Sequence, residues 1–393
     1  MVVEFCNSFI LIFYFIQFIF VVLFTYIFKK RFNEYNKWSR NSYFTWPHAE
    51  VILCLRGADE NLFDLLKALS SQFYLGTWQL QIIIDSPEDN SLKIVEYFQD
   101  THINHSLAKP SWQKLNIDFL KVRPSEGSLK CASLLKAFNN LNSKSSIIAF
   151  VDADASISND WLSNLVRSCS QAGVGAVSGN RWYMCQSNNI GAWIRSIWNY
   201  GALVLMTIYS IPWGGSLAVR REVIDKGDWN LILKDGLCED TGLIEPLKKL
   251  NLSYVFRPEI IITNKERYIN LFDLSNWLTR QLLTTRIHHS SWILVFLHSL
   301  CTFLVLAIAI LNGLWFSLLL YELGCLILLV WIELLVNKKI QSLRSLFLYI
   351  IPSQFLYIIT TFRSLITNKI EWSRVIYRVS RKHPYIKIIG SPR

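Results

Sequence analysis

The chain has 393 residues, of which 52% are apolar and 14% aromatic, and its formal net charge is +11. This length suits one large domain with added segments, or two domains, and the apolar content exceeds that of an ordinary soluble protein. The eight cysteines show no CxxC spacing. That argues against a cysteine metal site and favours reduced, mostly buried thiols of a cytosol-facing domain.

The first element is an apolar, uncharged run at residues 9–28, which is long enough to span a bilayer. A cleaved signal peptide is disfavoured because Glu4 stands where a basic region is usual and no small-residue cleavage site precedes Lys29. Lys29, Lys30 and Arg31 follow at once, and this positive charge places the next segment in the cytosol. We therefore predict a transmembrane helix and basic linker over residues 1–45.

Residues 46–290 alternate between strand-like and helix-like patterns. This alternation predicts an α/β fold with a mostly parallel, doubly wound sheet. The chain has neither GxGxxG nor GxxxxGK[ST], which excludes a standard dinucleotide-binding fold and a P-loop enzyme. The predicted strands are 51–55, 80–84, 117–122, 147–151 and 217–219, and the predicted helices are 59–71, 88–98, 130–141 and 242–250.

An acidic pair, Asp152 and Asp154, directly follows the apolar strand at 147–151. Two carboxylates one residue apart suit Mg²⁺ or Mn²⁺, whose remaining ligands can be the oxygens of a nucleoside diphosphate. A solvated turn is the alternative. The position favours a ligand, because open α/β sheets bind ligands beyond the carboxyl ends of their strands.

Further polar residues follow other strands of this sheet. Asp59 and Asp85 come after the first and second strands, where a carboxylate can bind a ribose hydroxyl or a base edge, or can simply cap a helix. Lys130 opens a helix and could bind a phosphate, or it could be solvated.

Two pairs of residues later in this region carry similar alternatives. Gly214 and Gly215 allow close backbone approach to a ligand, or form a hairpin turn. Glu239 and Asp240 precede a helix, where they could cap it or supply a general base for an acceptor hydroxyl.

Two amphipathic segments, 190–209 and 271–287, are predicted to dock at the membrane interface, with ordinary core packing as the alternative. The second contains Arg280 and Arg286. These arginines could neutralise a leaving diphosphate, or reach toward lipid headgroups.

The C-terminal third is again apolar, and then basic. Residues 292–336 are too long for one span, and Asn312 with Gly313 predicts a turn between spans at 292–311 and 314–336. The stretch 346–362 is short and contains Pro352, which favours a re-entrant or interfacial segment. We therefore predict a transmembrane hairpin at 291–337 and a basic interfacial segment and tail at 338–393.

That last segment holds eleven Lys and Arg against one acid, Glu371. Beside membrane segments, such a tail is typical of a cytosolic surface facing anionic headgroups. Nucleic acid is the alternative partner for a basic run, but no nucleic-acid motif is present, so we expect no nucleic-acid binding.

Taken together, these motifs resemble membrane-bound family 2-type glycosyltransferases with the GT-A fold, in particular the ceramide glucosyltransferase-like group and its bacterial counterparts. The resemblance covers about residues 46–290, and a Trp/Arg/Tyr segment at 371–378 extends it into the tail. It implies that Asp59 and Asp85 hold the nucleotide, that Asp152 and Asp154 bind metal and sugar nucleotide, and that Asp240 is the base. Lys130 and Gly214 match the helix-start lysine and the acceptor-site glycine.

The function that this resemblance implies is inverting transfer of a sugar from a nucleotide-diphosphate sugar, expected to be UDP-linked, to a membrane lipid hydroxyl in glycolipid biosynthesis. The chain departs from the family's (Q/R)xxRW motif, because Leu283 and Thr284 follow Arg280 in place of Arg-Trp. Arg286 is the candidate replacement cation. The alternatives are a processive polysaccharide synthase subunit, which needs that motif and more spans, and a non-catalytic protein with a degenerate domain, which would have lost Asp154 or Asp240.

Overall fold

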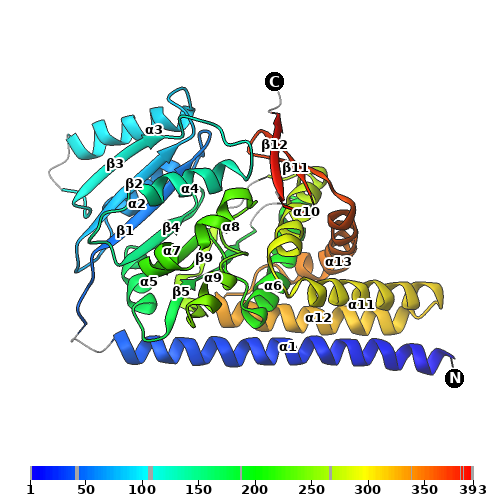
Figure 1. Ribbon diagram of the computed structural model, residues 1–393. Coiled ribbons are helices and arrows are strands. Elements are labelled where there is room, and N and C mark those ends of the chain that lie inside the picture. Colours follow the sequence, from blue (N-terminus) through cyan, green and yellow to red (C-terminus); the bar gives the residue numbers. More distant parts are fainter. Residues whose placement is uncertain are drawn as a thin grey trace. The chain divides into compact units, whose positions relative to one another are not determined.

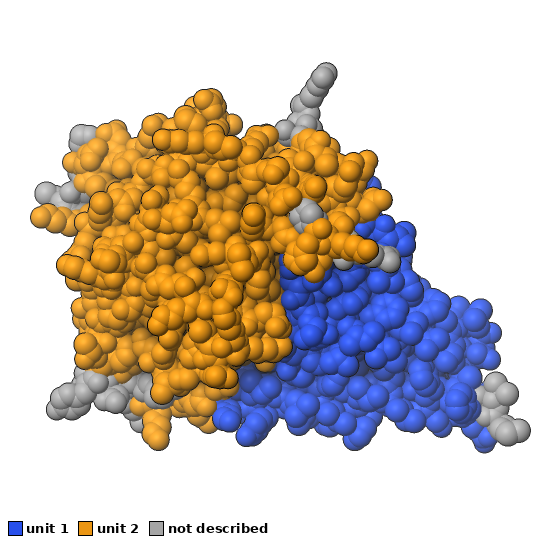
Figure 2. Space-filling model, in the orientation of Figure 1, with its two compact units in different colours: residues 1–30, 182–209, 265–367 blue, residues 31–181, 210–264, 368–393 orange. Residues whose placement is uncertain are grey.

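The computed structural model describes residues 2–39, 44–104, 109–185, 188–264, 268–337, 339–380, 382–383 and 385–390. The chain divides into two compact units, which Figure 2 shows in different colours. The sheet unit comprises residues 31–181, 210–264 and 368–393, and the helical unit comprises residues 1–30, 182–209 and 265–367. The chain therefore passes between the units several times, and the domain boundaries expected from the sequence stay a prediction.

The sheet unit is built on a mixed, mostly parallel sheet, as the sequence predicted (Figure 1). The first four strands in sheet order are parallel to one another, and only β7 runs antiparallel to both of its neighbours. The direction of β7 was not predicted. In sheet order the strands are β3 (Lys114–Phe119), β2 (Trp78–Ile84), β1 (Ala49–Leu55), β4 (Ile147–Val151), β7 (Ser216–Arg220), β5 (Val174–Ser178) and β8 (Ser253–Phe256).

Amphipathic helices pack on this sheet because their apolar residues recur every three to four positions. In α2, for example, Leu62, Leu65, Leu66 and Leu69 are all buried. On the face covered by α4 and α8, Phe138, Phe150 and Trp229 pack together in the core. The helices of this unit are α2 (Leu62–Ser70), α3 (Asn90–Phe98), α4 (Leu129–Asn139), α5 (Trp161–Cys169), α7 (Arg221–Lys226), α8 (Trp229–Asp235) and α9 (Ile244–Lys249).

Several short elements lie outside the main sheet and the helices that cover it. A π-helical turn, Gln99–Asn104, continues α3, and a 3₁₀ turn, Pro258–Ile260, follows β8. Two further strands of three residues each are β6 (Arg181–Tyr183) and β9 (Ile262–Asn264).

The basic tail folds into a small antiparallel sheet that belongs to the sheet unit. Its strands are β10 (Lys369–Trp372), β11 (Val375–Val379) and β12 (Ile386–Gly390). A two-residue turn joins β10 to β11, and both of its residues, Ser373 and Arg374, have positive φ, as a tight hairpin of this type requires. Val375, Tyr377 and Ile386 are buried, so the tail packs as a folded part of the unit.

The helical unit contains the N-terminal part of α1 (Val2–Ser39) together with α6 (Ile190–Tyr209), α10 (Leu271–His288), α11 (Trp292–Leu311), α12 (Trp315–Val336) and α13 (Leu343–Ile366). Among the described residues, four helices are long and apolar enough to cross a membrane, namely α1, α11, α12 and α13. The predicted turn between the second and third of these is confirmed, and Gly313 has the positive φ that such a turn favours.

The stretch around Pro352 differs from the sequence-based expectation of a short segment. It is one continuous helix of 24 residues, α13, with Pro352 inside it. Proline is tolerated within apolar helices where neighbouring groups satisfy the freed backbone carbonyl. The length and hydropathy of α13 suffice to cross a membrane. Whether it crosses or only enters the membrane therefore stays a prediction.

Candidate functional site

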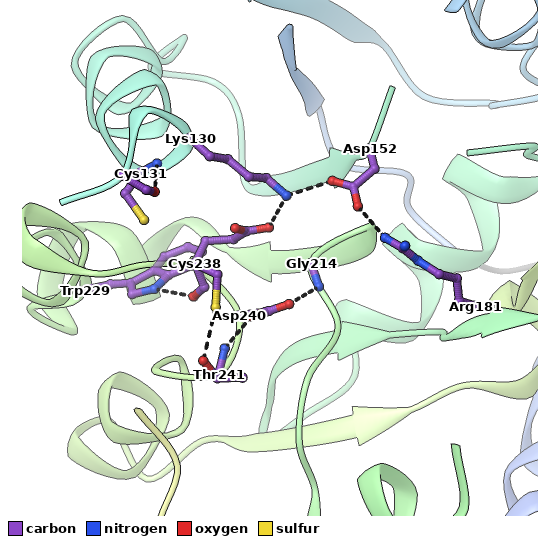
Figure 3. Close-up of polar contacts among 11 residues, drawn as sticks. Lys130, Cys131, Asp152, Arg181, Gly214, Trp229, Cys238, Asp240 and Thr241 are labelled. Carbon is purple, nitrogen blue, oxygen red and sulfur yellow. Dashed lines mark hydrogen bonds and ion pairs between the residues drawn. The ribbon is translucent and has the colours of Figure 1, made fainter. Parts of the chain in front are cut away.

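The centre of the site is an ion-pair network at the carboxyl end of β4 (Figure 3). Asp152 is the first residue after β4, and Lys130 lies in the first turn of α4, whose N-cap Ser128 accepts a hydrogen bond from the Cys131 amide at 3.1 Å. The Lys130 Nζ lies 2.7 Å from Asp152 Oδ1 and 2.6 Å from Glu239 Oε1. One ammonium group therefore joins two carboxylates from different parts of the chain.

The second oxygen of Asp152 also faces a cation. Arg181 Nη2 lies 3.1 Å from Asp152 Oδ2, and the Arg181 guanidinium lies over the Trp213 ring, 5.0 Å from its centroid. The aromatic face attracts the guanidinium and helps to fix its position. Asp152 is thus held from both sides by positive charge.

Burial has opposite effects on the two ends of the Lys130–Glu239 pair. Glu239 is only 1% exposed, and burial raises the pKa of its carboxyl to about 7, against the opposing influence of the Lys130 charge. Burial alone would lower the pKa of Lys130, but the neighbouring Asp152 and Glu239 outweigh it, and the pKa is raised well above its usual value. The lysine therefore stays charged throughout the physiological range.

Gly214 brings backbone into direct contact with the acidic pair that precedes α9. Its amide donates a hydrogen bond to Asp240 Oδ2 at 2.8 Å, and a Cβ added at this position would overlap Glu239 Oε1. The close approach expected of a glycine here is therefore made to these two carboxylates. Trp229 Nε1 donates to the Glu239 carbonyl at 3.1 Å, which fixes the chain just before Asp240.

A second charged pair lies at the ends of β1 and β2. Asp85 is buried and forms an ion pair with Arg56, and Arg123 Nη2 lies 4.0 Å from the same carboxylate oxygen. Burial raises the pKa of Asp85, while the two arginines act in the opposite direction. Asp59 Oδ1 accepts a hydrogen bond from the Asn61 amide at 2.9 Å, in the turn before α2, and the N-cap of α2 is Asn61. The part of Asp59 in nucleotide binding stays a prediction.

The acidic pair after β4 fits a divalent cation only together with ligand oxygens. Among the described residues, no group of three or more His, Cys, Asp or Glu side chains could hold a metal ion by itself. Asp154 is partly exposed, and its backbone carbonyl accepts a hydrogen bond from Asn264 Nδ2 at 3.3 Å. Mg²⁺ in nucleotide enzymes is commonly bound by one or two carboxylates plus substrate phosphates, and the role of Asp152 and Asp154 as such carboxylates stays a prediction.

The structure brings together some predicted site residues and adds others. Lys130, Asp152, Gly214, Glu239 and Asp240 form one connected group. Arg56 and Arg181 were not predicted as site residues, because each is a single arginine outside any motif and only the fold places it beside an aspartate.

Arg280 and Arg286 lie on α10 in the helical unit. The Arg286 Nη1 donates to the Leu365 carbonyl at 2.8 Å, near the end of α13, which is a structural contact. The catalytic role expected for both arginines stays a prediction.

Comparison with known families matches the part of the chain that contains Lys130, Asp152 and Gly214, whereas Glu239 and Asp240 lie beyond the matched range. Residues 50–227 match the family model described as glycosyl transferase family 2. This region is therefore similar to that family. A search of curated proteins finds no match to the sequence. The ceramide glucosyltransferase-like group is not confirmed by these comparisons.

The comparison of folds agrees with the match to this family. The chain is similar to the mannosyltransferase PcManGT from Pyrobaculum calidifontis, solved in complex with GDP-Man and Mn²⁺, with 15% identity, a TM-score of 0.54, and coverage of 92% of this chain and 99% of that one. Glucosyl-3-phosphoglycerate synthase from Mycobacterium tuberculosis, solved with Mn²⁺ and UDP-Glc, matches at 14% identity and a TM-score of 0.40 over 61% of this chain and 77% of that one. The first likeness shows the GT-A fold.

Proposed function

We propose that this protein transfers a sugar from a nucleotide-diphosphate sugar to the hydroxyl group of a membrane lipid, with inversion at the anomeric carbon. The observation that carries the proposal is the Lys130 bridge between Asp152 and Glu239, which links the metal-binding motif to the acidic pair that contains Asp240. Both halves of a sugar-transfer site are thereby connected within one unit. The family 2 match and the GDP-Man and Mn²⁺ bound by the Pyrobaculum enzyme support a nucleotide-sugar donor.

In the proposed reaction, Asp240 acts as the general base. It accepts the proton of the acceptor hydroxyl while the hydroxyl oxygen forms a bond to the anomeric carbon. The bond from that carbon to the diphosphate oxygen breaks, and its electron pair leaves with the nucleoside diphosphate. The Gly214 amide donates to Asp240 Oδ2 and the Thr241 amide donates to Asp240 Oδ1 at 2.7 Å, so the two amides hold the carboxylate in one orientation.

The cations around Asp152 have a corresponding role at the donor. Lys130 and Arg181 hold Asp152 in place, and their charges oppose the negative charge of a diphosphate bound next to it. A bound Mg²⁺ or Mn²⁺, held by Asp154 and Asp152, would supply further charge neutralisation at the diphosphate. At the other end, Asp85 with Arg56, and Asp59 at the start of α2, are the proposed contacts of the nucleoside.

The lipid acceptor is inferred from the four apolar helices that could cross a membrane. A site next to the bilayer meets a lipid hydroxyl without extracting the lipid far, and this proximity lowers the barrier to reaction. Lys29, Lys30 and Arg31, at the end of the first apolar run, support a cytosolic location for the sheet unit. We propose α6 and α10 as the interfacial helices, and Arg280 and Arg286 as additional cations for the leaving diphosphate.

The experiment that tests the proposed function measures transfer of radiolabelled sugar from a panel of UDP- and GDP-sugars into lipid extract. Purified membranes with and without Mn²⁺ or Mg²⁺ carry the wild type, Asp240→Asn, or the control Asp225→Asn, which changes an exposed aspartate paired with Arg221 on α7. We expect metal-dependent labelled lipid with the wild type and the control, and a loss of roughly 1,000-fold or more with Asp240→Asn.

Other results would contradict this proposal. Label that appears only in polymer would identify a synthase. Absence of label with every donor, for a protein that is folded, would identify a non-catalytic domain. Undiminished transfer by Asp240→Asn would remove Asp240 from the role of base.

A further inference from the structure

The C-terminal sheet contacts the Asp85 end of the site through the turn between β10 and β11. The Ser373 carbonyl accepts a hydrogen bond from Arg56 Nε at 2.6 Å, and the same guanidinium forms the ion pair with Asp85. A guanidinium presents its donors in a fixed fork, so the turn and Asp85 together set the orientation of Arg56. Arg374, the next residue of the turn, is exposed beside this contact.

The same sheet contacts the loop that leads into α4, the helix that carries Lys130. The Gly127 amide donates to the Ile386 carbonyl at 2.9 Å, and the Leu129 amide donates to the Tyr377 hydroxyl at 3.4 Å. The first amides of a helix have no acceptor within the helix, so Tyr377 satisfies one of them and fixes the start of α4. Tyr377 is buried, and Arg56 and Asp85 are close enough to influence it electrostatically.

A third contact attaches the sheet to the end of α8. Asp235 Oδ2 accepts a hydrogen bond from the Tyr385 amide at 3.1 Å and lies 2.6 Å from His383 Nδ1. Asp235 is buried, and it is separate from the group formed by Lys130, Asp152 and Glu239. It therefore offers a way to loosen the C-terminal sheet without changing any residue proposed to touch substrate.

We propose that the C-terminal sheet, β10–β12, is a positioning element for the nucleotide donor, which holds Arg56 against Asp85 and the start of α4 in the conformation that places Lys130. This inference rests on the proposed function. Its contacts meet both ends of the proposed donor site, the nucleoside end at Asp85 and the diphosphate end at Lys130.

The test compares the full-length wild type with Asp235→Ala and Tyr377→Phe, and with Asp225→Ala as the control for loss of a surface ion pair. Binding of UDP and of GDP, each with Mn²⁺, is measured by calorimetry on detergent-solubilised protein, and thermal unfolding is recorded in parallel. Hydrogen exchange of residues 126–131 reports on the start of α4 without any ligand. Loss of one or two hydrogen bonds from the positioning contacts is expected to raise the Kd of the preferred nucleotide roughly three- to tenfold.

The expected result is weaker nucleotide binding and faster exchange at residues 126–131 in Asp235→Ala and Tyr377→Phe, with the control unchanged in both. Unchanged Kd and unchanged exchange in both variants, with a wild type that binds nucleotide, would overturn the positioning role alone. A wild type that binds neither nucleotide would instead overturn the proposed function, and with it this inference. An equal loss of binding in the control would show a non-specific effect of reduced stability and would also overturn the positioning role.

Discussion

At the scale of single residues, Lys130 is the group on which the proposed chemistry depends most. A buried carboxylate without a partner is costly, and Lys130 offsets that cost for Glu239 while it also pairs with the half-buried Asp152. The arrangement leaves Asp240 to its contact with the Gly214 amide. One lysine therefore allows these carboxylates to lie close together.

Gly214 provides a sharp test at this scale. Gly214→Ala would place a Cβ onto Glu239 Oε1 and close to Asp240 Oδ2, so both side chains must move. We expect sugar transfer to fall by roughly 100-fold, because small displacements of reacting groups have effects of this size. The measurement is the initial rate of lipid labelling at saturating donor.

Gly201→Ala is the matched control for this change. Nothing lies within 4 Å of a Cβ added at Gly201, in α6, so its activity should stay within about twofold of wild type. Equal rates for the two variants would show that the contact between Gly214 and the acidic pair has no catalytic consequence.

At the scale of elements, the turn after β8 contains a carboxylate that makes stability depend on pH. Glu259 is 5% exposed, neither of its oxygens has a hydrogen-bond partner among the described residues, and Arg257 Nε lies 4.0 Å away. Burial raises the pKa of Glu259 from 4.5 to about 7. Because the folded state holds this proton more tightly than the unfolded state, stability is lost as the pH rises from about 4.5 to about 7.

Glu259→Gln should remove this pH dependence. The amide cannot ionise, so the variant should be more stable than wild type at pH 8 by about 3 kcal/mol, and the difference should shrink to less than about 1 kcal/mol by pH 5. Chemical denaturation at the two pH values measures this. Glu245→Gln, at an exposed position on α9, should show no such gain. A gain for Glu259→Gln of the same size at pH 5 would contradict the explanation.

Elements with a strong local pattern could be predicted from the sequence. The position of the acidic pair could be predicted too, because the pair directly follows one of these elements, β4. β4 has the predicted bounds because five consecutive apolar residues end at Asp152, and α6 and α11 also match their predicted ranges. α1 extends beyond the apolar run at residues 9–28, because the more polar residues that follow this run are also helical. The predicted ends of elements were therefore less accurate where they rested on composition alone, as in α1, than where a turn or a charged residue marked them, as in α11 and β4.

Contacts between distant parts of the chain could not be predicted in this way. The strands of the C-terminal sheet are four or five residues long and lie in a strongly basic segment. The charge of this segment predicted a tail facing headgroups, and the short strands were not predicted. The antiparallel direction of β7 depends on its pairing with β4 and β5 and leaves no periodic signal. The pairings of Arg56 with Asp85 and of Arg181 with Asp152 likewise join strand ends that only the folded sheet brings together.

At the scale of the whole molecule, the apolar helices predict a defined membrane topology. If α1 ends in the cytosol, the sheet unit is cytosolic, α11 crosses outward and α12 returns, so the turn at Asn312 lies on the opposite side of the membrane from Glu60. Both positions are exposed.

Single cysteines at Glu60 and Asn312 test this topology with a membrane-impermeant maleimide applied to intact cells. We expect Asn312→Cys to be labelled at once and Glu60→Cys only after permeabilisation, each relative to the unsubstituted protein. Labelling of Glu60→Cys in intact cells would place the sheet unit outside the cytosol and would contradict the proposed topology.

The attachment of β12 to the loop before α4 has a consequence for how the protein is made. Gly127 is synthesised before α11, α12 and α13, and its partner Ile386 is synthesised after them. Domains of a nascent chain fold progressively as synthesis proceeds, so the main sheet can form long before this contact exists. A chain interrupted within the apolar helices would therefore have a folded main sheet without the contacts that β10–β12 make to the proposed donor site. On the proposed positioning role, full nucleotide binding would require β12, which is synthesised after α11, α12 and α13.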